Sequence, residues 1–201
     1  MVRSGSGRWE SRNVTDSLSY RIVESRGRIE LREYAAYLSA EVDVEADDHF
    51  AAANRGFRPL AGYIFGGNVP KAKIAMTTPV TASPAGESID MTTPVTSALG
   101  GEGTYTVSFS MPSGWTMDTL PRPNDDRVRL VENPARLVLA NRFRGRSDAK
   151  RIAAGSRELL SYAADNSLVT LGEPVWAGYS APYVPLPLRR WEMLVHVRRE
   201  R

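Results

Sequence analysis

The sequence predicts an α+β domain in which antiparallel strands pack against one helix in each of two similar halves. Apolar residues alternate with polar ones over most of the chain, which is the pattern of half-buried strands. Helical spacing interrupts this alternation twice, once in each half. A proline-containing stretch without periodicity, residues 112–126, separates the halves. Closing the two sheets on one another would hide their edges, so we expect one compact domain.

The alternating runs define the expected strands and the limits of the halves. These runs are residues 20–24, 29–34, 37–44, 104–111, 128–132, 136–143, 174–179 and 191–197. The first half is expected to cover about residues 20–111 and the second about residues 127–198. The two halves are expected to superpose as pseudo-repeats, since each places strands before and after one helix.

The first helix is expected to begin after an N-cap at Asp47 or Asp48. Its predicted buried stripe consists of Phe50, Ala53, Phe57, Leu60 and Ile64. Gly56 and Pro59 lie inside this run, so we expect the helix to kink or to end early, before a loop at residues 62–68.

The second helix is expected to follow Ser147 as its N-cap. Its predicted stripe consists of Ile152, Ser156, Leu159, Leu160 and Ala163. The spacing of these residues places them on one side of a helix, which should face the sheet.

One segment occurs twice in nearly identical form. Residues 74–81 and 89–96 share the pattern Met-Thr-Thr-Pro-Val-Thr, and turn residues stand between the copies. The simplest interpretation is a hairpin over residues 73–96 in which Met76 and Met91 lie on one buried face.

Composition limits the function classes. The 201 residues include 26 basic and 23 acidic side chains, a net charge of +3, and no cysteine. We therefore expect no disulfide, no thiolate ligand and no cysteine nucleophile, and the scattered arginines do not form a nucleic-acid-binding stripe. No signal peptide or membrane span is recognisable, so we expect a soluble cytoplasmic protein with a disordered arm at residues 1–17.

The stretch Lys71 to Val80, with the sequence Lys-Ala-Lys-Ile-Ala-Met-Thr-Thr-Pro-Val, closely resembles the signature of the SOUL/haem-binding protein family. Residues 62–68, 108–125 and 178–192 resemble the family's loop after the first helix, its central linker, and its last loop and strand. Trp191 departs from the asparagine that is usual there. The resemblance covers about residues 18–198 as a single domain. It implies a distorted antiparallel β-barrel of two pseudo-repeats flanked by two α-helices.

The resemblance also implies a haem site on the exposed face of the first helix, with basic residues for the propionates. Asn54, Phe57 and Gly62 occupy that face here, and the family's basic position before the last strand falls near Val184. Two expected cations are thus absent. The arginines and the lysine that could replace them are Arg55, Arg58, Lys71 and Arg189, since a carboxylate needs a donor rather than a particular position.

Strong iron ligands are few in this sequence. Glu33 stands before Tyr34, where some family members have a histidine that has been proposed as a haem ligand. His196 is expected on the outer surface, and His49 is expected either as an exposed first-turn residue or as a ligand. Met76 and Met91 are expected in the core or against a haem plane. Haem would therefore be bound non-covalently, with weak axial ligation or none.

Three function classes follow for this domain. The first, from the resemblance, is reversible binding of haem or a related tetrapyrrole. The second is a small-molecule hydrolase or ligand-binding pocket that uses a buried glutamate with a raised pKa. Its candidates are Glu24, Glu30, Glu33, Glu41, Glu132 and Glu192. The third is a structural or interaction protein without a ligand, and a hemin titration separates the first class from the others.

Overall fold

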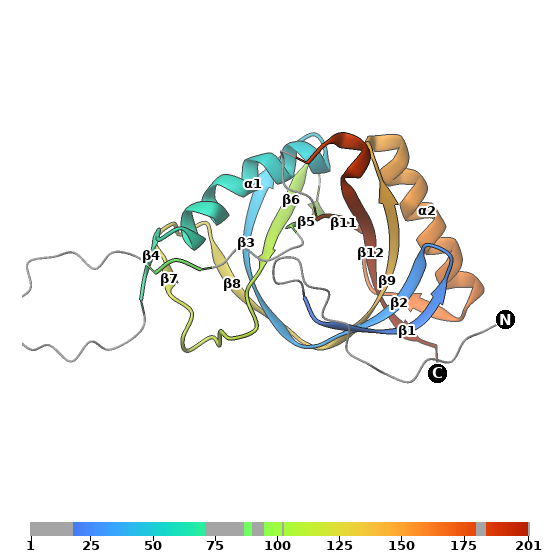
Figure 1. Cartoon of the computed structure of the whole chain (residues 1–201), viewed down its shortest axis with the longest axis horizontal. Helices are drawn as coiled ribbons and strands as arrows, with labels where there is room; N and C mark the ends of the chain where they lie inside the picture. Colours follow the sequence, from blue (N-terminus) through green and yellow to red (C-terminus); the bar gives the residue numbers. More distant parts are fainter. Residues whose placement is uncertain (1–17, 71–86, 90–94, 102, 180–183, 201) are drawn as a thin grey trace, which may run out of the picture.

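The computed structural model describes residues 18–70, 87–89, 95–101, 103–179 and 184–200 (Figure 1). In chain order the elements are β1 (Tyr20–Arg26), β2 (Ile29–Tyr34), β3 (Tyr37–Glu45), α1 (His49–Ile64), β4 (Asn68–Val69), β5 (Val95–Gly101), β6 (Thr104–Ser110), β7 (Arg122–Pro123), β8 (Arg129–Asn133), β9 (Arg136–Arg144), α2 (Ala149–Asp165), β10 (Leu168–Thr170), β11 (Val175–Gly178), a 3₁₀ turn η1 (Leu186–Leu188) and β12 (Arg190–Arg199). Both helices and every predicted strand that the structure describes are therefore confirmed, and the short strands β4, β7 and β10 are additions.

A single curled antiparallel sheet forms the body of the molecule, and both helices lie on its outer side (Figure 1). Nine strands follow the order β1-β2-β9-β12-β11-β5-β6-β3-β8, and β10 pairs with β12. This confirms the predicted α+β fold, a distorted barrel flanked by two helices. The small β4-β7 ladder stands apart from this sheet.

The order of strands is nearly symmetric about the β11-β5 pairing. Reading outward from it gives β11, β12, β9 and β2 on one side, and β5, β6, β3 and β8 on the other. Each half therefore sends an early strand to the other half: β2 of the first half, with β1 beside it, pairs with β9, and β8 of the second half pairs with β3. The halves interlock through these exchanged strands, while their superposition over the expected limits stays a prediction.

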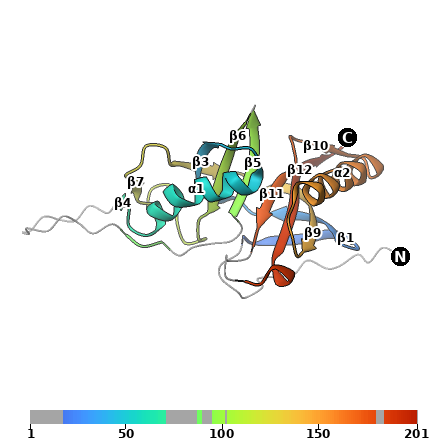
Figure 2. The same ribbon diagram turned by 90° about the horizontal axis from the view of Figure 1, so that it is seen from above.

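The two helices cover different parts of the sheet (Figure 2). The buried apolar side chains accordingly form two separate cores, one under each helix. Ala40, Val42, Val107 and Phe109 lie beneath α1, and Leu31, Leu139, Met193 and Val195 lie beneath α2. Because successive residues of a strand point to opposite faces, the polar residues between these apolar ones line the inner face of the sheet.

Helix α1 begins after Asp48, whose side chain accepts a hydrogen bond from the Ala51 amide at 2.7 Å, as predicted. The helix continues to Ile64 with Pro59 inside it, so the expected early end before residue 62 is wrong, while the alternative of a kink stays a prediction. The predicted stripe is also partly wrong. The buried face consists of Ala52, Gly56, Leu60, Tyr63 and Ile64.

Gly56 is the reason for this rotation of α1. A Cβ atom built on it would lie 2.5 Å from the Val107 Cβ atom, so the glycine lets the helix backbone approach β6 closely. The apolar stripe read from residue spacing contains Phe50 and Phe57, but close approach through Gly56 turns both of them toward the exposed side.

Helix α2 is capped by Asp148, whose side chain accepts from the Arg151 amide at 2.9 Å. The prediction of Ser147 as the cap is wrong because its hydroxyl instead accepts from the Trp176 indole at 2.8 Å. Gly155, Leu159 and Ala163 form the buried face, and Leu160 is exposed.

The repeated hairpin, with Met76 and Met91, lies outside the described residues except for positions 87–89 and 95–96. Within that part, Ile89 is buried and its amide donates to the Ile64 carbonyl at 2.7 Å. Val95 is the first residue of β5 and packs at the margin of the core beneath α1.

Among the helices that the structure describes, none has the length and apolar character that crossing a membrane requires.

We predict opposite effects on stability for two glycine-to-alanine substitutions on α1. Gly56→Ala should destabilise the fold by about 1–3 kcal/mol, since the added methyl overlaps the stiff Val107 side chain. Gly62→Ala should stabilise it by up to about 1 kcal/mol, because a Cβ there meets nothing within 4 Å. Urea unfolding of both variants measures the difference. Equal destabilisation would contradict the close approach of α1 to β6.

Candidate functional site

The exposed face of α1 brings together several of the residues predicted for the haem site. Asn54, Phe57, Arg58 and Gly62 recur at helical spacing and are all exposed. Phe65 continues this stripe at the end of the helix and is 65% exposed. We call these five residues the α1 face. The face presents two aromatic rings and one cation, with open space above Gly62.

Phe57 joins the α1 face to the core beneath it. Its side chain is 37% exposed, and its ring packs edge-on against buried Phe109 with centroids 5.4 Å apart. One part of the ring is therefore held in place by the core while another part remains available to a flat apolar ligand.

The predicted cations on α1 differ in how they are held. Arg55 donates from Nη1 to the main-chain carbonyl of Glu45, at the end of β3. Arg58 is exposed on the α1 face itself. Both guanidinium groups therefore lie on or beside the α1 face, where a carboxylate could meet them.

His49 is directed away from the α1 face. Its Nδ1 atom lies 3.0 Å from the carbonyl oxygen of Ser97, and its ring packs edge-on against Tyr105 at 4.9 Å. Burial lowers the pKa of His49, although the Ser97 carbonyl and Asp48 act in the opposite direction. The imidazole is therefore held between α1 and the sheet, which matches neither the expected exposed residue nor a ligand that faces solvent.

Of the remaining predicted residues, the structure describes Arg189, which is not part of the α1 face. Arg189 belongs to the second half, where its Nε atom donates to the Val184 carbonyl at 2.8 Å and its own carbonyl accepts from the Gly145 amide at 3.0 Å. Met76, Met91 and Lys71 lie outside the described residues, so their predicted roles stay predictions.

A second group of polar residues is buried on the inner face of the sheet. Arg32 on β2 has no exposed surface and reaches across to β12, where its Nη1 and Nη2 atoms donate to the two Glu192 oxygens at 2.7 and 2.8 Å. Its Nε atom donates to Glu30 at 2.8 Å. Tyr20 stacks on the guanidinium at 4.4 Å, and the Tyr179 hydroxyl donates to Glu192 at 2.7 Å.

Electrostatics keep this buried group intact. Burial alone would lower the pKa of Arg32. Its hydrogen bonds to Glu192 and the negative charge of that residue outweigh burial, so the pKa of Arg32 is raised. Burial also raises the pKa of Tyr34, whose hydroxyl accepts from Arg32 at 3.1 Å, to about 12. The arginine therefore stays charged and the tyrosine stays neutral at physiological pH.

This pairing bears directly on the buried-glutamate hypothesis. Glu30 and Glu192 are buried, as that hypothesis requires, but Arg32 donates to both of them and Arg142 also pairs with Glu30. A guanidinium favours the ionised form of its carboxylate partner, whereas a general acid must hold its proton. The other strand glutamates that form ion pairs, Glu24, Glu33 and Glu41, pair with Arg199, Arg21 and Arg129. These pairs work against a hydrolase that uses a protonated glutamate.

His196 shares a face with Glu192 and Leu194, as predicted, but that face is the inner one. The prediction of an outer position is wrong because the apolar residues of β12 turn outward to α2 and the polar ones turn inward. Both ring nitrogens of His196 lie near Nη1 of Arg136, at 3.2 and 3.3 Å. Burial and the Arg136 charge lower the pKa of His196 to about 4.

The sequence predicts Glu30 and Glu192 as candidates but not their partner Arg32. A signal is present in β2, where Glu30, Arg32 and Tyr34 share one face of the strand and the buried Ile29 and Leu31 lie on the other. Within the part of the chain that the structure describes, no three His, Cys, Asp or Glu side chains gather as a metal site would require.

The fold is shared with two solved structures. The chain resembles the C-terminal domain of EcmrR, with a TM-score of 0.59 and 13% identity, over 86% of this chain and 98% of that domain. It also resembles a hydrolase from Listeria innocua, with a TM-score of 0.58 and 12% identity, over 85% of this chain and 92% of that one. These similarities define a class of curled-sheet α+β domains, and at such identities they show the fold alone.

The sequence places the chain within that class. A profile of the SOUL heme-binding protein family matches residues 15–196. Heme-binding protein 2 of Homo sapiens is 30% identical over 158 residues, which cover 78% of this chain and 72% of the relative. Heme-binding protein 2 of Mus musculus is 30% identical over 159 residues, with the same coverage. The chain belongs to the SOUL heme-binding protein family.

We predict that the Arg32 pair is a large contributor to stability. Arg32→Met leaves Glu192 buried without its cation, and urea unfolding should show a loss of about 3–5 kcal/mol. Adding Glu192→Gln should recover part of that loss. The matched control is Arg127→Met, which removes a surface pair with Asp125 and should leave stability nearly unchanged. Similar losses in the two single variants would contradict this account.

We also predict an acid sensitivity that depends on His196. Its pKa is about 4 in the folded state against 6.5 in the unfolded chain, so the unfolded state binds more protons in this interval and stability falls as pH decreases from 6.5 to 4. His196→Gln should remove about 1–2 kcal/mol of this pH dependence, after allowance for solvent screening. Unfolding curves at several pH values measure it. An unchanged pH profile would show that His196 titrates normally.

Proposed function

We propose that this protein binds haem or a related tetrapyrrole reversibly and without a covalent bond, on the α1 face. The observation that carries the proposal is the α1 face itself, where the core-anchored ring of Phe57 lies near the exposed Arg58 and the open surface at Gly62. Membership of the SOUL heme-binding protein family, and relatives named Heme-binding protein 2, support the choice of ligand.

Apolar contact is the main source of affinity in this proposal. Burial of apolar surface contributes about 25 cal/mol per Å², so a porphyrin that covers a few hundred Å² on Phe57 and Phe65 gains several kcal/mol. Association costs reduce this gain, and a micromolar dissociation constant requires about 8 kcal/mol in total. The affinity therefore has to include a further contribution from charged contacts.

Arg58 and Arg55 supply those contacts in the proposal. The two propionates of haem are carboxylates, and guanidinium groups form strong hydrogen bonds with carboxylates. Arg58 extends from the α1 face, while Arg55 is anchored on the Glu45 carbonyl beside it. Haem would supply redox-active iron to this surface, and the protein's own contribution would be to bind the ring and its acid groups.

Strong axial ligation has little support from the residues of the chain. Cysteine is absent from the sequence. His49 contacts Ser97 and Tyr105 beneath α1, and the family's proposed histidine position is Glu33, which is paired with Arg21. We therefore propose that iron is coordinated weakly or not at all by the protein, as suits a haem carrier, buffer or sensor.

We predict that charge on α1 controls hemin affinity. Charge reversal by Arg58→Glu or Arg55→Glu should weaken hemin binding several-fold, because it repels the propionates. The matched control is Arg157→Glu on α2, an exposed arginine outside this site, which should leave the affinity unchanged. His49→Ala should also change it little. Hemin titration followed by visible absorption measures all four. A low-spin bis-ligated spectrum that His49→Ala abolishes would overturn the proposed contacts.

We further predict that Gly62 must stay small for hemin to bind. Gly62→Gln places an uncharged side chain in open space and should keep the fold intact while lowering hemin affinity by about tenfold or more. Gly62→Ala should have a much smaller effect. Circular dichroism checks the fold, and the same titration measures affinity. If Gly62→Gln binds hemin as well as the wild type, the ligand lies elsewhere on the molecule.

A further inference from the structure

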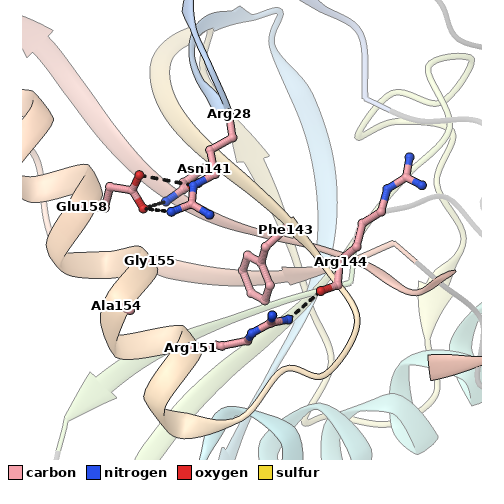
Figure 3. Close-up of a pocket in the computed structure, with 8 residues that line it drawn as sticks. All are labelled: Arg28, Asn141, Phe143, Arg144, Arg151, Ala154, Gly155 and Glu158. Atoms are coloured by element: carbon pink, nitrogen blue, oxygen red, sulfur yellow. Dashed lines mark hydrogen bonds and ion pairs between the residues drawn. The ribbon is translucent and has the colours of Figure 1, made fainter. Parts of the chain in front are cut away.

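A groove lies in the second half of the molecule, between α2, the end of β9 and the β1-β2 turn (Figure 3). Its volume is about 230 Å³. Arg28 and Glu158 lie at one end, Arg151 at the other, and Phe143 and Gly155 between them (Figure 3). We call it the α2 groove. Nothing in the proposed haem site uses these residues.

The first end of the α2 groove is rich in hydrogen-bond acceptors. Arg28 donates to both Glu158 oxygens, at 3.2 and 2.7 Å, and the Asn141 amide nitrogen donates to Glu158 at 2.9 Å. Although burial raises the pKa of Glu158, these contacts outweigh it and lower the pKa, so Glu158 is a carboxylate. Two donors arranged around one carboxylate keep it in a fixed position at the groove wall.

Asn141 supports this end of the α2 groove from the core side. The residue is 2% exposed, and its amide nitrogen donates to Glu158. Its Oδ1 atom forms no hydrogen bond with any residue that the structure describes, and this atom has almost no exposed surface. A ligand that brings an O–H or N–H group to this end of the α2 groove would therefore meet Glu158.

The second end of the α2 groove carries an unbalanced positive charge. Arg151 donates from Nη1 to the main-chain carbonyls of Arg144 and Arg146, at 2.6 and 3.2 Å. No ion pair joins it to a carboxylate among the residues that the structure describes. Both hydrogen bonds leave from the same nitrogen, so the other two nitrogens of the guanidinium can receive an anion.

The middle of the α2 groove is apolar and narrow. Phe143 supplies a ring on one side, and the backbone of α2 at Gly155 supplies the other (Figure 3). A Cβ atom at Gly155 would lie 2.9 Å from the Met193 Cγ atom, so the glycine lets α2 sit close to the sheet at this point. A flat ring can lie between such surfaces and gain apolar contact on Phe143.

We propose that the α2 groove binds a small amphipathic carboxylate that carries a hydroxyl or amine at its far end. The acid group meets Arg151, the apolar body lies against Phe143, and the donor meets Glu158, which Arg28 and Asn141 hold in place. Ligand pockets for drug-sized molecules usually measure about 300–1,000 Å³, so a groove of about 230 Å³ suits a single-ring acid rather than a tetrapyrrole. The site is therefore separate from haem binding.

Three probes that share one ring test the two ends of the α2 groove separately. 4-Hydroxybenzoate has both the acid and the donor, benzoate lacks the donor, and phenol lacks the acid. Titration of the isotope-labelled full chain, followed by NMR, should show saturable shifts of the Arg151 and Asn141 signals with 4-hydroxybenzoate. Benzoate should bind about 3- to 10-fold more weakly than 4-hydroxybenzoate, as the loss of one hydrogen bond implies. Phenol should bind more weakly than 4-hydroxybenzoate by about tenfold or more.

Matched variants assign the binding to the α2 groove. Arg151→Gln should weaken both acids by about tenfold and leave phenol unchanged, since only the acids carry a charge for it. Arg157→Gln removes an exposed arginine from the same helix and should have no effect. Ala154→Phe fills the groove from an exposed helix position and should abolish binding of all three probes. This variant tests the site independently if Arg151→Gln fails to fold.

Two outcomes would overturn the proposal. Equal affinities for the three probes would show that neither end of the α2 groove recognises its expected group. Equal losses in Arg151→Gln and Arg157→Gln would show that the acids respond to the general charge of the helix. Hemin titration of Ala154→Phe should be normal, so a failure of this proposal is distinguishable from a failure of the haem proposal.

Discussion

The fork of hydrogen bonds between Arg32 and Glu192 is the interaction on which the arrangement of the two halves depends. Arg32 belongs to β2, the strand that the first half sends into the second, and Glu192 belongs to β12, with β9 between them. The pair therefore fastens an exchanged strand to the half that receives it. A buried pair is costly to desolvate, but once formed it penalises any register that leaves either charge alone, so it favours one pairing of strands over others.

The polar interior that results from this pairing determines where ligands can bind. In many barrels the apolar residues face inward, whereas this sheet turns its apolar residues outward to two helices and closes around Arg32, Glu192 and the half-buried Arg136. An apolar ligand therefore gains most on the outer surface, beside the helices. The two buried glutamates, Glu30 and Glu192, are both paired with Arg32, and this pairing weighs against a mechanism in which either of them acts as a protonated acid.

Much of the fold could be predicted because period-two alternation and helix caps are local signals. Asp48 is an example, since a cap depends only on the residues that follow it. Prediction failed where the orientation of a residue depends on a segment far away in the chain. Residue spacing places His196 and Glu192 on one face of β12. It does not tell whether that face is the inner one, because this depends on where α2 packs. The spacing also favoured Phe57 as a buried residue. The structure instead turns Gly56 toward Val107, on a strand far along the chain, because the valine leaves no room there for a side chain. At the site, the exposed face of α1 followed from family resemblance, and the partners of Glu30 and Glu192 were missed.

The two halves also explain why one helix offers an open face and the other a groove. In each half an arginine of the helix donates to the last carbonyl of the preceding strand, Arg55 to Glu45 and Arg151 to Arg144, so both helices carry a fixed cation on one flank. Apart from β10, which pairs with β12, the strand order of the two sides differs at the ends: β1 extends the sheet beyond β2, and the other side stops at β8. The β1-β2 turn brings Arg28 against Glu158 of α2, which closes one end of the groove. Among the described residues, no strand lies next to β8 in the way that β1 lies next to β2. The two helices and their arginines are similar, but α1 therefore presents an open face, whereas α2 borders a groove with a closed end.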